Sequence, residues 1–116
     1  MADKPVSMNT AQQLRVGIVG AGHFGRFHAL KSAANPAEQL VALYDPDPAR
    51  AAVVAREVRC GIATSYENLL ERVDAVIIAA PAEYHFALTS QALRAGRHVL
   101  VEKPIAATLD EAHALA

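Results

Sequence analysis

The sequence predicts an α/β fold, a doubly wound parallel sheet with helices on both faces. Short apolar runs alternate with helix-forming stretches along the chain, as in repeated strand–helix–strand units. The run 74–80 is almost continuously apolar after its first residue, which is typical of a strand covered on both faces. Right-handed crossovers between such strands give the strand order 3-2-1-4-5.

Turn and cap residues separate the predicted elements. Asp47 is expected to cap the second helix, with Pro48 in its first turn, and Ser65 to cap the third. Gly96 is expected to stop the fourth helix. In chain order, the strands are expected at residues 15–19, 40–44, 60–63, 74–80 and 98–101, and the helices at 23–33, from 48 onward, at 65–70 and at 83–95.

One domain is expected from a chain of 116 residues, which can bury roughly 65% of its unfolded surface. We expect residues 1–13 to form a flexible polar tail and residues 14–116 to form the domain. A capping box at 108–111 predicts a last helix, and the chain ends at Ala116 without the usual sixth strand or a second domain. The fifth strand is therefore expected to be an open edge, through which the chain can self-associate.

Composition excludes several classes of function. The net charge is −1 without a basic cluster, which argues against nucleic-acid binding. No apolar run has the length of a membrane span and the polar N-terminus lacks a signal peptide, so we expect a cytoplasmic protein. Cys60 is the only cysteine, so no intrachain disulfide can form. Four histidines lack the spacing of a metal site, and no metal is expected: His23, His28, His98 and His113.

A glycine-rich turn, Gly20-Ala21-Gly22-His23-Phe24-Gly25, stands between the first strand and the first helix. Gly20 permits the tight turn, Gly22 lets backbone approach a diphosphate, and Gly25 lets the helix pack closely on its strand. The N-terminus of the helix adds free N–H groups and a partial positive charge. The alternative is a loop that only turns the chain. At this strand-to-helix junction, the pattern favours a Rossmann site for a dinucleotide. The cofactor-binding residues expected in the turn are Gly20, Gly22, His23, Phe24 and Gly25.

Asp45 follows Gly20 by 25 positions, at the end of the second strand. A carboxylate there is expected to accept hydrogen bonds from the adenosine ribose and to repel a 2′-phosphate, which favours NAD over NADP. Arg50 opposes this preference, because it could reach a 2′-phosphate. Taken alone, Asp45 would be interpreted as an ordinary turn residue before proline, but Gly20, Gly22 and Gly25 upstream favour the ribose role.

Small residues end the fourth strand, and Ala80 and Pro81 are expected to leave room for the cofactor at the carboxyl edge of the sheet. The alternative is a plain strand-to-helix turn. His85 lies early in the next helix, and as an isolated histidine it reads as a capping or surface group.

Glu102, Lys103 and Pro104 end the fifth strand at the same edge. Beside a nicotinamide, the Lys103 ammonium could donate a hydrogen bond to a substrate oxygen and favour the negative charge that develops there. The alternative is a solvated lysine in a loop.

Together these residues resemble the N-terminal domain of the Gfo/Idh/MocA oxidoreductases, a family that includes glucose-fructose oxidoreductase and inositol dehydrogenases. The matching segments are residues 16–28, 44–45, 80–85 and 95–104. The resemblance implies NAD(P)-dependent hydride transfer involving a sugar, inositol or related hydroxyl compound. It also implies that Lys103 is the active-site lysine and that His85 lies near the cofactor, so these two are the expected catalytic residues. Glu102, His85 and Lys103 are also expected to contact the cofactor. Ala80 departs from the family pattern, in which many members carry threonine.

Length is the main departure, since members of this family have a second domain that supplies the substrate pocket and the partners of the lysine in proton transfer. The resemblance therefore implies that this chain binds nucleotide and lacks turnover alone. A stand-alone NAD(H)-binding or sensing module that docks to a partner through the open strand is the alternative function.

Overall fold

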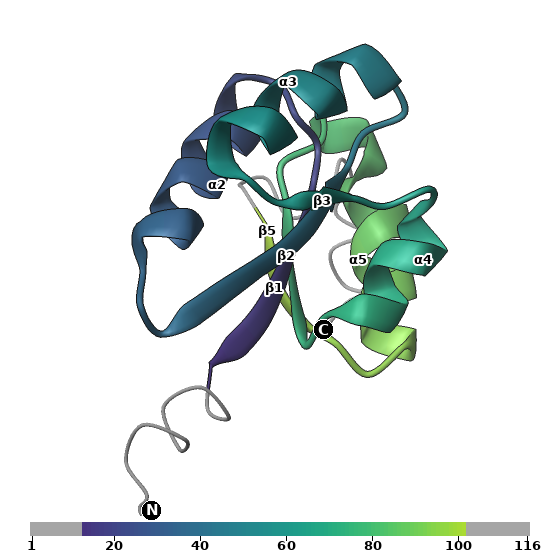
Figure 1. Cartoon of the computed structure of the whole chain (residues 1–116). Helices are drawn as coiled ribbons and strands as arrows, with labels where there is room; N and C mark the ends of the chain where they lie inside the picture. Colours follow the sequence, from purple (N-terminus) through teal and green to yellow (C-terminus); the bar gives the residue numbers. More distant parts are fainter. Residues whose placement is uncertain (1–12, 102–116) are drawn as a thin grey trace, which may run out of the picture.

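A parallel five-stranded sheet organises the computed structural model, which describes residues 13–101 (Figure 1). The strands are β1 (Leu14–Val19), β2 (Glu38–Tyr44), β3 (Gly61–Ile62), β4 (Ala75–Ile78) and β5 (His98–Val101). The helices are α2 (His23–Ala34), α3 (Pro48–Val58), α4 (Tyr66–Arg72), the 3-10 turn η1 (Ala82–Tyr84) and α5 (His85–Arg94). The order β3-β2-β1-β4-β5 confirms the prediction. The predicted helix after residue 108 lies outside the described residues.

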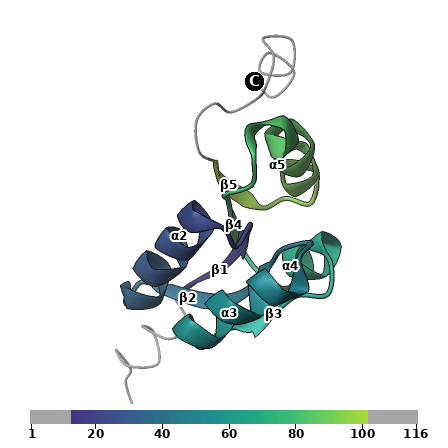
Figure 2. The same ribbon diagram turned by 90° about the horizontal axis from the view of Figure 1, so that it is seen from above.

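The central strands are covered on both faces, and successive residues of a strand point to opposite sides. In β1, Ile18 packs in the apolar cluster beneath α2 and α3, whereas Val19 packs in the cluster beneath α4. Figure 2 shows α2 and α3 on one side of the sheet and α4 and α5 on the other. The continuous apolar run in β4 follows from this double covering. Within residues 13–101, no helix has the length and apolar character needed to cross a membrane.

The predicted caps form as expected. The Asp47 carboxylate accepts hydrogen bonds from the first-turn N–H groups of α3, and the Ser65 hydroxyl accepts one from the N–H of Asn68. Gly96 has a φ of 78°, a conformation that lets the chain leave α5 sharply. Strand β4 ends two residues earlier than predicted, because Ala79 and the next two residues already turn toward α5.

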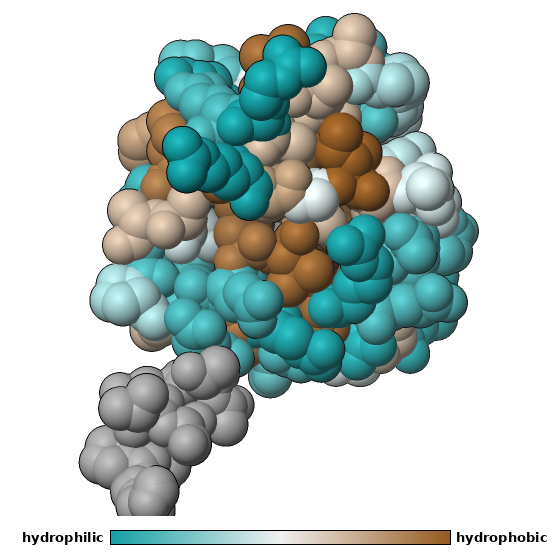
Figure 3. Space-filling model, in the orientation of Figure 1, coloured by the Kyte–Doolittle hydropathy of each residue, from teal (hydrophilic) through white to brown (hydrophobic). Residues whose placement is uncertain are grey.

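Hydrophobic side chains are exposed at both ends of the described sheet. Figure 3 shows hydrophobic side chains in the middle of one molecular face with hydrophilic ones below them, and Ile62 of β3 is 46% exposed. Strand β5 is the last strand at the other end of the described sheet, and Leu100 is 57% exposed. Self-association through β5 stays a prediction.

An ion pair ties the start of β1 to the entry of β4. Asp74 accepts hydrogen bonds from the backbone N–H of Arg15 and from its guanidinium, at 2.9 to 3.2 Å. These hydrogen bonds stabilise the carboxylate and lower the pKa of Asp74 to about 2.

Candidate functional site

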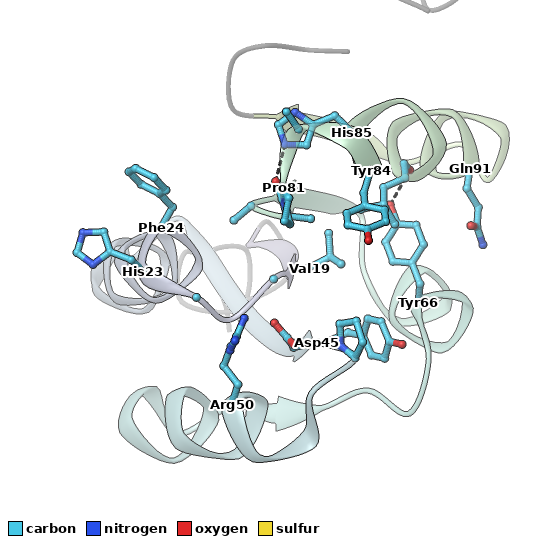
Figure 4. A pocket seen from close by; sticks show the side chains of 18 residues that line it. Val19, His23, Phe24, Asp45, Arg50, Tyr66, Pro81, Tyr84, His85 and Gln91 are labelled. Carbon is cyan, nitrogen blue, oxygen red and sulfur yellow. Dashed lines mark hydrogen bonds between the residues drawn. The ribbon is translucent and has the colours of Figure 1, made fainter. Parts of the chain in front are cut away.

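An open cavity of about 880 Å³ lies at the carboxyl ends of β1, β2 and β4 (Figure 4). Strand β1 lies between β2 and β4, and the helices that precede these two strands, α2 and α4, cover opposite faces of the sheet. The cavity therefore occupies the topological switch point, where ligands bind in open α/β sheets. Eight of the predicted site residues line it: Gly20, Gly22, His23, Phe24, Asp45, Ala80, Pro81 and His85.

Two glycines of the turn are required by the fold, whether or not a ligand binds. Gly20 has a φ of 105°, and a Cβ there would lie 2.8 Å from the carbonyl carbon of Ala79. A Cβ on Gly25 would fall on the carbonyl oxygen of Gly20, 2.6 Å from its carbonyl carbon. Gly25 does not line the cavity, so its role is the close packing of α2 against the turn.

Gly22 differs from the other two glycines of the turn. Its φ of −78° is open to any residue, and a Cβ there would meet only the Nη1 atom of Arg50, at 4.0 Å. It is the N-cap of α2, where it offers no side-chain cap, and no acidic residue follows in the first turn. The N–H groups that begin α2 thus have no intrahelical partners and favour an anion in the cavity.

Asp45 both holds the turn and faces the cavity. Its Oδ2 accepts from the N–H of Ala21 at 2.7 Å, and its Oδ1 accepts from the N–H of Asp47 at 2.8 Å. Each carboxylate oxygen can accept a further hydrogen bond. The two alternatives for this residue are therefore compatible: it fixes the loop after β2 and still presents acceptors to a ligand.

Arg50 brings a positive charge to the same end of the cavity. It belongs to the first turn of α3, and Figure 4 shows its side chain extending from α3 toward the turn after β1, while Asp45 lines the same cavity. A carboxylate and a guanidinium thus both line the cavity near the position predicted for the ribose.

His85 is buried rather than at the surface, with 2% of its area exposed. Its Nε2 lies 2.6 Å from the carbonyl oxygen of Ala80, and since a carbonyl only accepts, Nε2 donates. The imidazole therefore ties the start of α5 to the loop after β4. Glu102 and Lys103, with Pro104, lie outside the described residues.

Several residues that line the cavity were missed by sequence reasoning. They are Tyr44, Pro46, Tyr66, Tyr84, Leu88 and Gln91. Tyr66 donates its O–H to the carbonyl of Leu88 at 2.8 Å, and burial raises the pKa of Tyr66. The spacing of His85, Leu88 and Gln91 by three residues places them on one face of α5, which is the signal that could have indicated two of these residues.

Comparison with known proteins agrees with this geometry. Residues 14–116 match the family GFO_IDH_MocA, described as an oxidoreductase family with an NAD-binding Rossmann fold. The chain is 47% identical over 102 residues to UDP-N-acetylglucosamine 3-dehydrogenase from Acidithiobacillus ferrooxidans, covering 88% of this chain and 32% of that protein. It is 36% identical to inositol 2-dehydrogenase from Rhizobium meliloti, covering 79% of this chain and 28% of that protein.

A solved structure of a protein from gentamicin A biosynthesis in complex with NAD superimposes with a TM-score of 0.86 at 33% identity, covering 90% of this chain and 31% of that one. The chain thus spans about a third of the length of the proteins it matches.

Proposed function

The chain belongs to the Gfo/Idh/MocA family of oxidoreductases, and on this premise we propose that residues 14–116 form the cofactor domain of a dehydrogenase. Its substrate is a sugar, an inositol or a related hydroxyl compound. The names of two relatives, a UDP-N-acetylglucosamine 3-dehydrogenase and an inositol 2-dehydrogenase, support this substrate class. The proposed activity belongs to a longer protein, since the chain spans only 32% of the first of these relatives.

The glycine at position 22 is the main support for the proposed cofactor site. Neither backbone conformation nor packing requires a glycine there, yet the position faces the cavity at the N-terminus of α2. A bound diphosphate supplies the missing reason, because a side chain would occupy its space. The cavity of about 880 Å³ is also within the size range of cofactor sites.

NAD is the proposed cofactor rather than NADP. The Asp45 carboxylate already accepts two backbone N–H groups and keeps acceptors for ribose hydroxyls, but it would repel a 2′-phosphate. Arg50 reduces that repulsion, so we expect the preference for NAD to be moderate. Replacement of Arg50 by alanine should lower NADP affinity more than NAD affinity.

Hydride transfer is the chemistry that a bound nicotinamide supplies. In the proposed site, Lys103 donates a hydrogen bond to the reacting substrate oxygen, as the family resemblance implies. An ammonium there stabilises the negative charge that develops on that oxygen. His85 is proposed as a positioning residue, because its Nε2–H group holds the Ala80 carbonyl and so the shape of the loop that lines the cavity. Proton transfer needs a further acid–base partner, so we expect no turnover from these residues alone.

Calorimetric titration of the 116-residue chain with NADH and NADPH tests the proposed function. We expect saturable binding of both, tighter for NADH, and competition by ADP, which carries the diphosphate and the adenosine. A thermal shift that grows with ligand concentration provides an independent readout. Absence of binding by both dinucleotides would contradict the proposal, and so would turnover of a sugar by this chain alone.

A further inference from the structure

The cavity continues past Asp45 toward α4 and α5, which contribute Tyr66 and Gln91 to its lining. Figure 4 shows Tyr66 and Gln91 on the side of Asp45 that faces away from His23 and Phe24. On the proposed function, the ribose lies at Asp45 and the base attached to it extends away from the diphosphate. Tyr66 and its hydrogen-bond partner Leu88 line this part of the cavity, and their aromatic and apolar surfaces suit the flat face of a base.

Gln91 is the polar residue of interest at this end. It is half-buried on α5 and lines the cavity. Its Nε2 donates a hydrogen bond to the Oε2 atom of Glu67 on α4, at 3.3 Å. A carboxylate can only accept, so Glu67 holds the nitrogen of the amide and leaves its oxygen available on the other side.

Glu67 is suited to holding the amide nitrogen of Gln91 at neutral pH. It lies in the first turn of α4, and hydrogen bonds lower its pKa, first from its own backbone N–H and then from Gln91. The side chain is therefore ionised and offers no proton to the amide. Rotation of the amide by half a turn would bring the Gln91 oxygen against the carboxylate, which is unfavourable.

We propose that Gln91 recognises the 6-amino group of adenine through its amide oxygen, with Glu67 as the positioning residue that fixes the orientation of the amide. An amide oxygen accepts from an amino group and repels a carbonyl oxygen. The site thereby selects an adenine dinucleotide over one whose base carries oxygen at that position, and this inference rests on the proposed function.

Nicotinamide hypoxanthine dinucleotide is the probe, because it differs from NAD by a carbonyl oxygen in place of the 6-amino group. We expect the chain to bind NADH about threefold to tenfold more tightly than the reduced hypoxanthine analogue, the effect of about one hydrogen bond. Gln91→Leu should remove this preference and lower NADH affinity. Glu67→Gln should reduce the preference while Gln91 is still present, because the amide can then rotate.

Glu71→Gln is the matched control, since it makes the same charge change at an exposed position of α4. It should leave both affinities unchanged, and circular dichroism should show all variants folded. Equal binding of the two dinucleotides by the unmodified chain would overturn the role of Gln91 while the proposed function stands. A preference that persists in Gln91→Leu would also overturn it. Binding of neither dinucleotide would overturn the proposed function itself and the inference with it.

Discussion

The variant Gly22→Val tests whether the glycine at position 22 is needed for ligand binding or for the stability of the fold. A Cβ at this position meets only Arg50, at 4.0 Å, and the backbone has an ordinary φ. We therefore expect a loss of stability of about 1 kcal/mol or less, mostly from a poorer N-cap. In a domain of this size that corresponds to a fall in melting temperature of roughly 4–8 °C.

NADH affinity should fall far more than stability. A valine side chain occupies the space of the diphosphate and separates it from the N–H groups that begin α2. The loss of two hydrogen bonds to a charged group, at about 1.5 kcal/mol each, is about 3 kcal/mol. The dissociation constant measured by calorimetry should then rise at least about a hundredfold.

Two glycine variants serve as controls for this experiment. In Gly25→Ala the new Cβ falls on the backbone of Gly20, so stability should drop by about 3 kcal/mol or more. In Gly96→Ala nothing lies within 4 Å, but φ is 78°, so stability should fall by about 1 kcal/mol with unchanged NADH affinity. Unchanged affinity in Gly22→Val would refute the diphosphate position, and a loss of stability like that of Gly25→Ala would make Gly22 a structural residue.

Further predictions concern three other positions. Asp45→Asn should weaken NADH binding and narrow the gap to NADPH in calorimetry, and an unchanged ratio would mean that Asp45 does not discriminate at the ribose. The pKa of Asp74 is about 2 in the folded protein against an ordinary value of 3.8, so its stabilising effect is present above about pH 4 and is lost as the pH falls toward 2. Urea unfolding of Asp74→Asn should show a shallower loss of stability over that range, and an unaltered slope would contradict the role of its pair with Arg15. Tyr66→Phe removes the hydrogen bond to the Leu88 carbonyl and should lower stability by about 1 kcal/mol, whereas a variant as stable as the unmodified chain in urea would show that this bond contributes nothing.

Local chemistry explains why most of the fold was predictable. Asp47 and Ser65 cap helices through atoms within three residues, and Gly96 needs its positive φ for the turn it makes, so each signal is contained in a few residues. Strand order follows from the alternation of elements and the handedness of crossovers. The exact strand ends were harder to predict, because β3 pairs over only Gly61–Ile62 although the apolar run is longer.

The glycine turn and Asp45 were predictable as residues of the cavity for the same reason. Gly20 and Gly22 belong to one short motif, and Asp45 follows the next strand. The lining by Tyr66 and Gln91 was not predictable, because α4 and α5 contribute them from distant parts of the sequence. The orientation of an amide depends on a carboxylate 24 residues away, which no local pattern records.

Contact between the diphosphate and the turn after β1 is tested most directly by NMR titration of the ¹⁵N-labelled chain with NADH. The backbone amide signals of Gly22, His23 and Phe24 should shift strongly and saturate together, while those of Gly61 and Gly96 should stay in place. Saturating shifts elsewhere, with the three turn amides unmoved, would show that the dinucleotide binds at another surface.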